Sequence, residues 1–119
     1  MKTSALAVLL LLNFAFVAAH GQIDRAMMQP AIAEFDKSDA ELNAVYKKVL
    51  SQLSPKGLEA LKEAQRAWLI FRDKTAEAYG TGEEGSSNEK VMYVRCAAAI
   101  TRNRTKELKT LFLSDHYPY

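Results

Sequence analysis

The chain has 119 residues, a formal net charge of +2, 49% hydrophobic residues and a single cysteine. This length allows one small domain and excludes a dinucleotide-binding fold joined to a substrate domain. One cysteine excludes a disulfide within the chain, and it excludes a zinc site built from a cysteine cluster. The composition therefore bounds the size of the protein and leaves its function to be sought in the motifs.

The N-terminal segment has the features of a secretory signal peptide. Lys2 is its only charged residue, and residues 5–12 are wholly apolar. A basic start, a short apolar stretch and small residues before a polar chain are typical of such a leader. Cleavage after Ala19 or after Gly21 fits the small-residue rule, and we take residues 1–21 as the leader of a periplasmic or secreted protein. An uncleaved membrane anchor is the alternative, although the apolar run is shorter than the roughly 20 residues that span a bilayer.

Residues 22–119 are predicted to form a single domain that starts with a minor helix. Apolar side chains recur at helical spacing in residues 23–37, but Pro30 would break or kink a helix there. We therefore expect a short or bent leading helix ahead of the main ones.

The first main helix is predicted to begin at Ser38. Residues 38–41 read Ser-Asp-Ala-Glu, which is a capping box at a helix N-terminus. Behind it an apolar face follows at helical spacing: Leu42, Val45, Tyr46, Val49 and Leu53.

The second main helix is predicted to begin at Ser54 and Pro55. Ser54 is a good N-cap, and proline suits the first helical position because its missing N–H costs nothing there. An apolar stripe runs on through Trp68 to Tyr79, and Gly80 is a natural C-terminal stop. We expect this helix to be the most central of the bundle.

Residues 80–88 contain three glycines and no periodicity, which indicates a long loop. A second capping box, Ser-Ser-Asn-Glu at residues 86–89, predicts that the third helix begins near Ser87. This helix should end near Leu113 and leave residues 116–119 as a tail.

No stretch alternates apolar and polar residues as a strand would. The fold is therefore predicted to be all-α, an antiparallel bundle of three main helices plus the leading one.

The chain offers few groups for catalysis. After the leader, His116 in the tail is the only histidine, and a tail rarely holds a base in a fixed geometry. No Glu-x-x-His pair or glycine-rich phosphate loop is present. We therefore predict a protein that is not an enzyme and that needs no cofactor and no metal.

Charge is concentrated on the third helix. Across residues 90–109, six Lys or Arg residues oppose only Glu107, a net charge of +5. These cations complement the helix dipole and keep a face solvated. Alternatively, a patch including Arg102 and Arg104 binds an anionic wall polymer or lipid headgroups. Nucleic acid is not expected as a partner of an exported protein.

Cys96 on this helix is interpreted as a small buried side chain, with an intermolecular disulfide as the alternative.

Trp68, Arg72 and Asp73 are predicted to form an internal polar cluster. Trp68 and Arg72 lie four residues apart, so that the guanidinium stacks on the indole along the helix. Asp73 could pair with Arg102 or Arg104 across the bundle. A site that faces a ligand is the second interpretation of the same residues.

A set of motifs resembles the family named for the lysozyme inhibitor LprI, in its N-terminal-like domain. They are Leu42–Asn43 with Tyr46, Ala64–Gln65–Arg66–Ala67–Trp68, Phe71–Arg72–Asp73, Gly85–Ser86, Cys96, and Thr101 with Arg104–Thr105 and Leu108. The resemblance covers about residues 35–111, and it implies a small exported helical protein of a bacterial envelope. It also implies structural roles for the motif residues, namely Trp68, Phe71, Arg72, Asp73, Gly85, Cys96, Thr101 and Leu108.

This chain departs from the family pattern in two ways. The family often has a cysteine shortly after Phe-Arg-Asp that pairs with the one matching Cys96, whereas Lys-Thr-Ala stands here at residues 74–76. The inhibitor that named the family is a lipoprotein, and no cysteine lies near either cleavage point of this chain.

Two functional hypotheses follow. In the first, the protein inhibits a lysozyme-type muramidase, and the loop residues Glu83, Glu84 and Ser86 enter or cap the enzyme's cleft, where carboxylates suit a basic lysozyme. In the second, it is a structural or interaction module of the envelope that binds an anionic polymer or a partner protein through the basic third helix.

Overall fold

The computed structural model describes residues 5–86 and 88–115, and it describes side chains from residue 25 onward. The predicted tail at residues 116–119 and the predicted helix start at Ser87 lie outside these residues. Three helices follow in order: α1 (Ala5–Leu50), α2 (Pro55–Gly80) and α3 (Asn88–Leu108). A short 3₁₀ helix, η1 (Thr81–Glu83), precedes α3, and a π-helix, η2 (Lys109–Leu113), follows it. No strand occurs in the described chain, and the predicted all-α bundle is confirmed.

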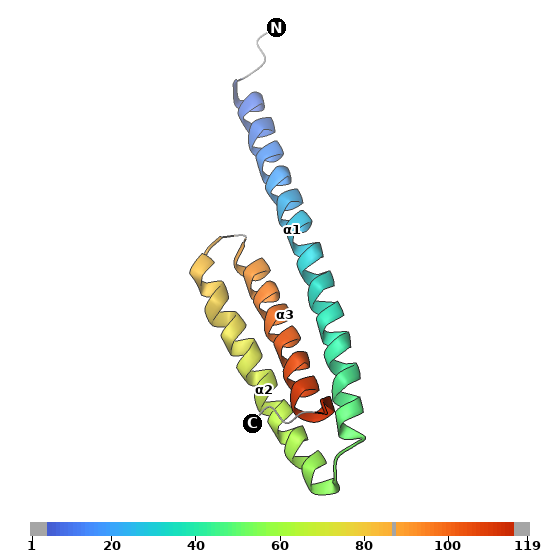
Figure 1. Cartoon of the computed structure of the whole chain (residues 1–119). Helices are drawn as coiled ribbons and strands as arrows, with labels where there is room; N and C mark the ends of the chain where they lie inside the picture. The colour runs from blue at the N-terminus through green and yellow to red at the C-terminus, as the bar shows by residue number, and fades with distance from the viewer. Residues whose placement is uncertain (1–4, 87, 116–119) are drawn as a thin grey trace.

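The central helix is α3, which packs against both α1 and α2 (Figure 1). The prediction that the second helix is the central one is therefore wrong. Most of the buried side chains of α3 are small, which allows close approach of its neighbours. The buried residues of α3 are Val91, Ala97, Ala98, Thr101, Thr105 and Leu108, together with the longer Arg104.

The leading helix and the first main helix are one continuous helix. α1 passes through Pro30 and Ser38 without a break, so that the predicted boundary between them is wrong. The buried Ser38 hydroxyl donates to the carbonyl of Glu34 at 2.8 Å instead of capping a helix start. A face that buries Ala31, Leu42 and Val49 supports α1 across both residues, since packing contributes more to helix stability than propensity does.

Both ends of α2 lie where the sequence places them. The Ser54 side chain accepts a hydrogen bond from the backbone N–H of Gly57 at 3.2 Å, and Pro55 is the first helical residue. Gly80 ends α2, but its φ of −62° is right-handed, so that it is not a left-handed cap. A Cβ on Gly80 would lie 3.1 Å from the carbonyl oxygen of Glu89, and glycine therefore permits the close approach of α3.

The segment between α2 and α3 is more ordered than a long loop. After η1, Gly85 adopts a φ of +79°, a backbone conformation that residues with a Cβ rarely adopt. The Ser86 hydroxyl accepts from the N–H of Asn88 at 3.2 Å, and the Glu89 carboxylate accepts from the N–H of Gly85 at 3.4 Å. Ser86 and Glu89 therefore both accept backbone amides near the start of α3, but each amide is one residue away from its place in the predicted capping box.

The apolar core lies toward the end of the bundle where α1 stops and α2 starts. Its buried residues come from all three helices: Leu42, Val49, Leu61 and Leu108, with Trp68 and Leu113 packed against them. At the opposite end α1 continues beyond α2 and α3 (Figure 1). Among residues with described side chains, burial begins at Ala31. No described helix has the length and apolar character required to cross a membrane.

Candidate functional site

Trp68 lies at the centre of a cluster of aromatic and guanidinium groups. The guanidinium carbon of Arg72 lies 5.4 Å from the centroid of the Trp68 ring and 5.3 Å from that of Phe35 on α1. The guanidinium of Arg104 approaches the same indole at 5.9 Å from α3. The predicted stacking of Arg72 on Trp68 is confirmed, and the cluster joins all three helices.

Hydrogen bonds compensate the buried charges of this cluster. Arg104 donates from Nε to the side chain of Gln65 at 3.2 Å and from a terminal nitrogen to Glu107 at 2.6 Å. Arg72 pairs with the adjacent Asp73 at 2.8 Å. The predicted pairing of Asp73 with Arg102 or Arg104 is wrong, because Arg104 reaches inward to Trp68 and Glu107 while Arg102 pairs with Glu34 of α1.

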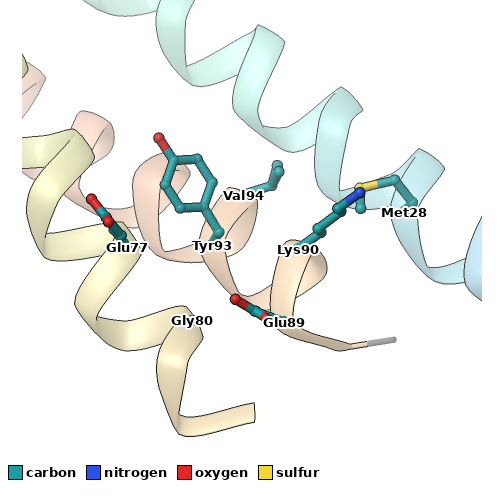
Figure 2. A pocket seen from close by; sticks show the side chains of 7 residues that line it. All are labelled: Met28, Glu77, Gly80, Glu89, Lys90, Tyr93 and Val94. Atoms are coloured by element: carbon teal, nitrogen blue, oxygen red, sulfur yellow. The ribbon is translucent and has the colours of Figure 1, made fainter. Parts of the chain in front are cut away.

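Next to this cluster, an apolar groove lies between α1 and α2, and α3 forms its floor. It consists of two adjacent cavities, of about 320 Å³ and about 200 Å³, that share Tyr93 and Val94 of α3. We call it the α1–α2 groove. Its wall on α1 is Met28, Ile32 and Phe35, its wall on α2 is Arg72, Asp73, Glu77 and Gly80, and its floor on α3 is Glu89, Lys90, Tyr93, Val94 and Ala97. Figure 2 shows the larger cavity, with Tyr93 between Glu77 and Val94.

The two cavities lie in sequence along the groove. The smaller one adjoins the cluster through Phe35 and Arg72, and the larger one reaches Gly80 at the end of α2. Its carboxylates are partly engaged: Glu77 pairs with Lys74 at 2.7 Å, and this hydrogen bond and charge raise the pKa of Lys74. Such a groove suits an apolar or aromatic group. Among the described residues, no three side chains of the metal-ligating types gather to hold an ion.

The loop residues proposed from sequence lie beside this groove. Glu83, Glu84 and Ser86 are exposed, and the loop that carries them joins Gly80 to Asn88 beside the larger cavity, which Gly80 and Glu89 line. Residues 77–90 hold four glutamates and one lysine, a net charge of −3. An acidic, exposed loop and an apolar groove therefore share one end of the molecule.

The other candidate residues are divided between core and surface. Thr101 and Leu108 are buried, Cys96 is half-buried and unpaired, and Phe71 is 58% exposed. Arg104 is buried, so the structure does not place it on a basic surface patch; Arg102 is exposed but pairs with Glu34.

Sequence reasoning missed the α1 wall of the groove and Tyr93 on its floor. Met28, Ile32 and Phe35 lie at helical spacing on one face, a signal that was available in the sequence. Pro30 between them argued against a continuous helix and obscured it.

The fold and this surface define a small all-α bundle whose exposed end is suited to binding. The chain belongs to the LprI lysozyme inhibitor family: the family model described as "Lysozyme inhibitor LprI" matches residues 17–108. The chain is also 37% identical over 94 residues to "Uncharacterized protein R02472" of Rhizobium meliloti (strain 1021), covering 68% of each chain. No solved structure matches the chain.

Proposed function

We propose that the protein is an exported binding protein of the cell envelope that inhibits a lysozyme-type muramidase. The observation that carries this proposal is the membership of most of the chain in the LprI family. Residues 1–21 serve as the leader in this proposal, and the remaining chain acts by binding the enzyme without transforming a substrate.

The loop end is the part of the surface that we assign to the enzyme. A lysozyme-type muramidase works with two carboxylates in a cleft, so that an inhibitor has to fill the cleft or cover its rim. The exposed Glu83 and Glu84 stand on a segment fixed by η1 and by the Ser86 cap. The net charge of −3 over residues 77–90 complements a basic enzyme and speeds association with it.

A lysis assay tests this proposal. The purified protein, in micromolar excess, is expected to slow the clearing of a cell-wall suspension by a basic lysozyme. The double variant Glu83→Gln/Glu84→Gln should weaken inhibition about fivefold, because each exposed charge contributes up to about 1 kcal/mol. No slowing with any of several lysozymes would disprove the inhibitory function.

The matched control changes two carboxylates at the other end of α2. Glu59→Gln/Glu63→Gln removes the same charge from exposed positions far from the loop. Inhibition should be unchanged by it. If both double variants weaken inhibition equally, the loop is not the contact surface, even though the protein inhibits.

A further inference from the structure

The end of the bundle opposite the acidic loop combines exposed apolar side chains with lysines. Leu113 of η2 packs against the core, while Leu111 and Phe112 of the same π-helix remain 39% and 38% exposed. Lys109 lines a shallow depression together with Lys48 from the last turn of α1. We call residues 47–56 and 106–115 the basic end.

The charge of the basic end is opposite to that of the loop. Its five lysines face only Glu107 and Asp115, a net charge of +3. Glu107 is engaged by Arg104, which reduces its effect on the surface further. Lysines near a helix C-terminus complement the helix dipole, and this accounts for Lys47, Lys48 and Lys106. It does not account for the exposure of Leu111 and Phe112 beside them.

We propose that the basic end docks on the surface of an anionic lipid bilayer. Leucine and phenylalanine enter the boundary between headgroups and acyl chains, and lysines are attracted by anionic headgroups. A soluble polyanion would use the cations alone and gain nothing from exposed apolar groups. Docking in this way points the acidic loop away from the membrane, because the two lie at opposite ends of α2 and α3 (Figure 1). These helices have 26 and 21 residues and separate the two ends by about 30–40 Å.

Charge distinguishes this surface from a second pair of exposed apolar side chains, which lies on α2. Ile70 and Phe71 on α2 are 67% and 58% exposed. The charged residues four and seven positions from Ile70 on the helix balance one another, since Arg66 and Lys74 oppose Glu63 and Glu77. That face has no net attraction for an anionic surface, and it supplies the control positions.

Co-sedimentation with vesicles tests the proposal. The full chain is mixed with vesicles of phosphatidylcholine, with or without phosphatidylglycerol, at low and high salt. Because all variants share the apolar residues 5–12, they are compared with one another. At low salt, Lys109→Gln should reduce binding to the anionic vesicles about fivefold, whereas Lys74→Gln should leave this binding unchanged. At high salt, the difference between Lys109→Gln and the unchanged chain should disappear. Phe112→Ser should reduce binding about fivefold, and the matched Phe71→Ser should leave it unchanged.

Three outcomes would overturn the proposal. One is anionic-vesicle binding that neither Lys109→Gln nor Phe112→Ser weakens, with circular dichroism showing that both variants are folded. Another is an equal loss with Phe71→Ser. The third is a pair of results: heparin, a soluble polyanion, binds in a way that depends on Lys109, and Phe112→Ser changes neither heparin binding nor vesicle binding. This pair would show that the basic end is a polyanion site instead. Lysozyme inhibition should survive Phe112→Ser, so that this test stands apart from the proposed inhibitory function.

Discussion

At the scale of single residues, Trp68 shows how a charged group is kept inside a small bundle. Arg104 is 8% exposed, and a buried charge is costly unless it is paired and hydrogen-bonded. Gln65, Glu107 and the face of the indole together supply these contacts. Removing the indole therefore removes apolar packing and also one of the groups that compensate the guanidinium.

Trp68→Ala is expected to lower the free energy of unfolding by about 3 kcal/mol, as for other large-to-small core substitutions. Urea denaturation followed by circular dichroism measures it. Trp68→Phe retains a ring for the two guanidinium groups and should cost less than half as much. A loss below 1 kcal/mol for Trp68→Ala would show that the indole contributes little to the core.

Part of this cluster could be predicted from the sequence, and part could not. The contact between Trp68 and Arg72 follows from a spacing of four residues on one helix. The contact with Arg104 depends on which faces α2 and α3 turn toward each other, and spacing within one helix does not contain that information. The pairing of Asp73 with the adjacent Arg72 is also not expected from spacing, because residues i and i+1 do not face each other on a helix.

At the scale of elements, α1 shows where local signals fail. Ser54 caps α2 as predicted, because the chain turns there and the first amides of the helix need a partner. Ser38 also has a capping signature, the box that it forms with Glu41, but the chain does not turn there, and its hydroxyl donates one turn back to the carbonyl of Glu34. Each serine is followed by a signal for a helix start, and the packing of residues before Ser38 against the bundle is what separates the two cases.

Pro30→Ala is expected to stabilise the protein by about 1–3 kcal/mol. Proline within a helix loses a backbone hydrogen bond and costs about 3 kcal/mol relative to alanine, and the exposed Pro30 ring contributes little packing in return. Thermal or urea unfolding measures the change. Ala33→Pro, at an exposed position one turn further along α1, should destabilise by a similar amount. No gain from Pro30→Ala would mean that α1 begins at Pro30, where proline costs nothing.

At the scale of the whole molecule, the arrangement of the helices shapes the surface more than their boundaries do. The groove exists because α3 lies between α1 and α2 and brings Tyr93 under Met28 and Ile32. The sequence predicted three main helices and a leading one, and the expectation that the second main helix is central is wrong. Which helix is central depends on how side chains of three elements fit together, and an apolar stripe rich in large residues such as that of α2 does not reveal it. The acidic loop, by contrast, was visible as a local feature and lies at the surface as expected.

Removal of residues 1–21 is expected to leave the bundle intact, with a free energy of unfolding within about 0.5 kcal/mol of that of the full chain. The described burial begins at Ala31, and α1 extends past α2 and α3 on that side, so the truncated chain keeps every described core contact (Figure 1). Urea denaturation of both forms measures the difference. A longer truncation that also removes Ala31 and Phe35 should be destabilised by several kcal/mol, since Phe35 stacks on Arg72. If the short truncation already unfolds the protein, residues 1–21 belong to the fold, and their assignment as a cleaved leader must be abandoned.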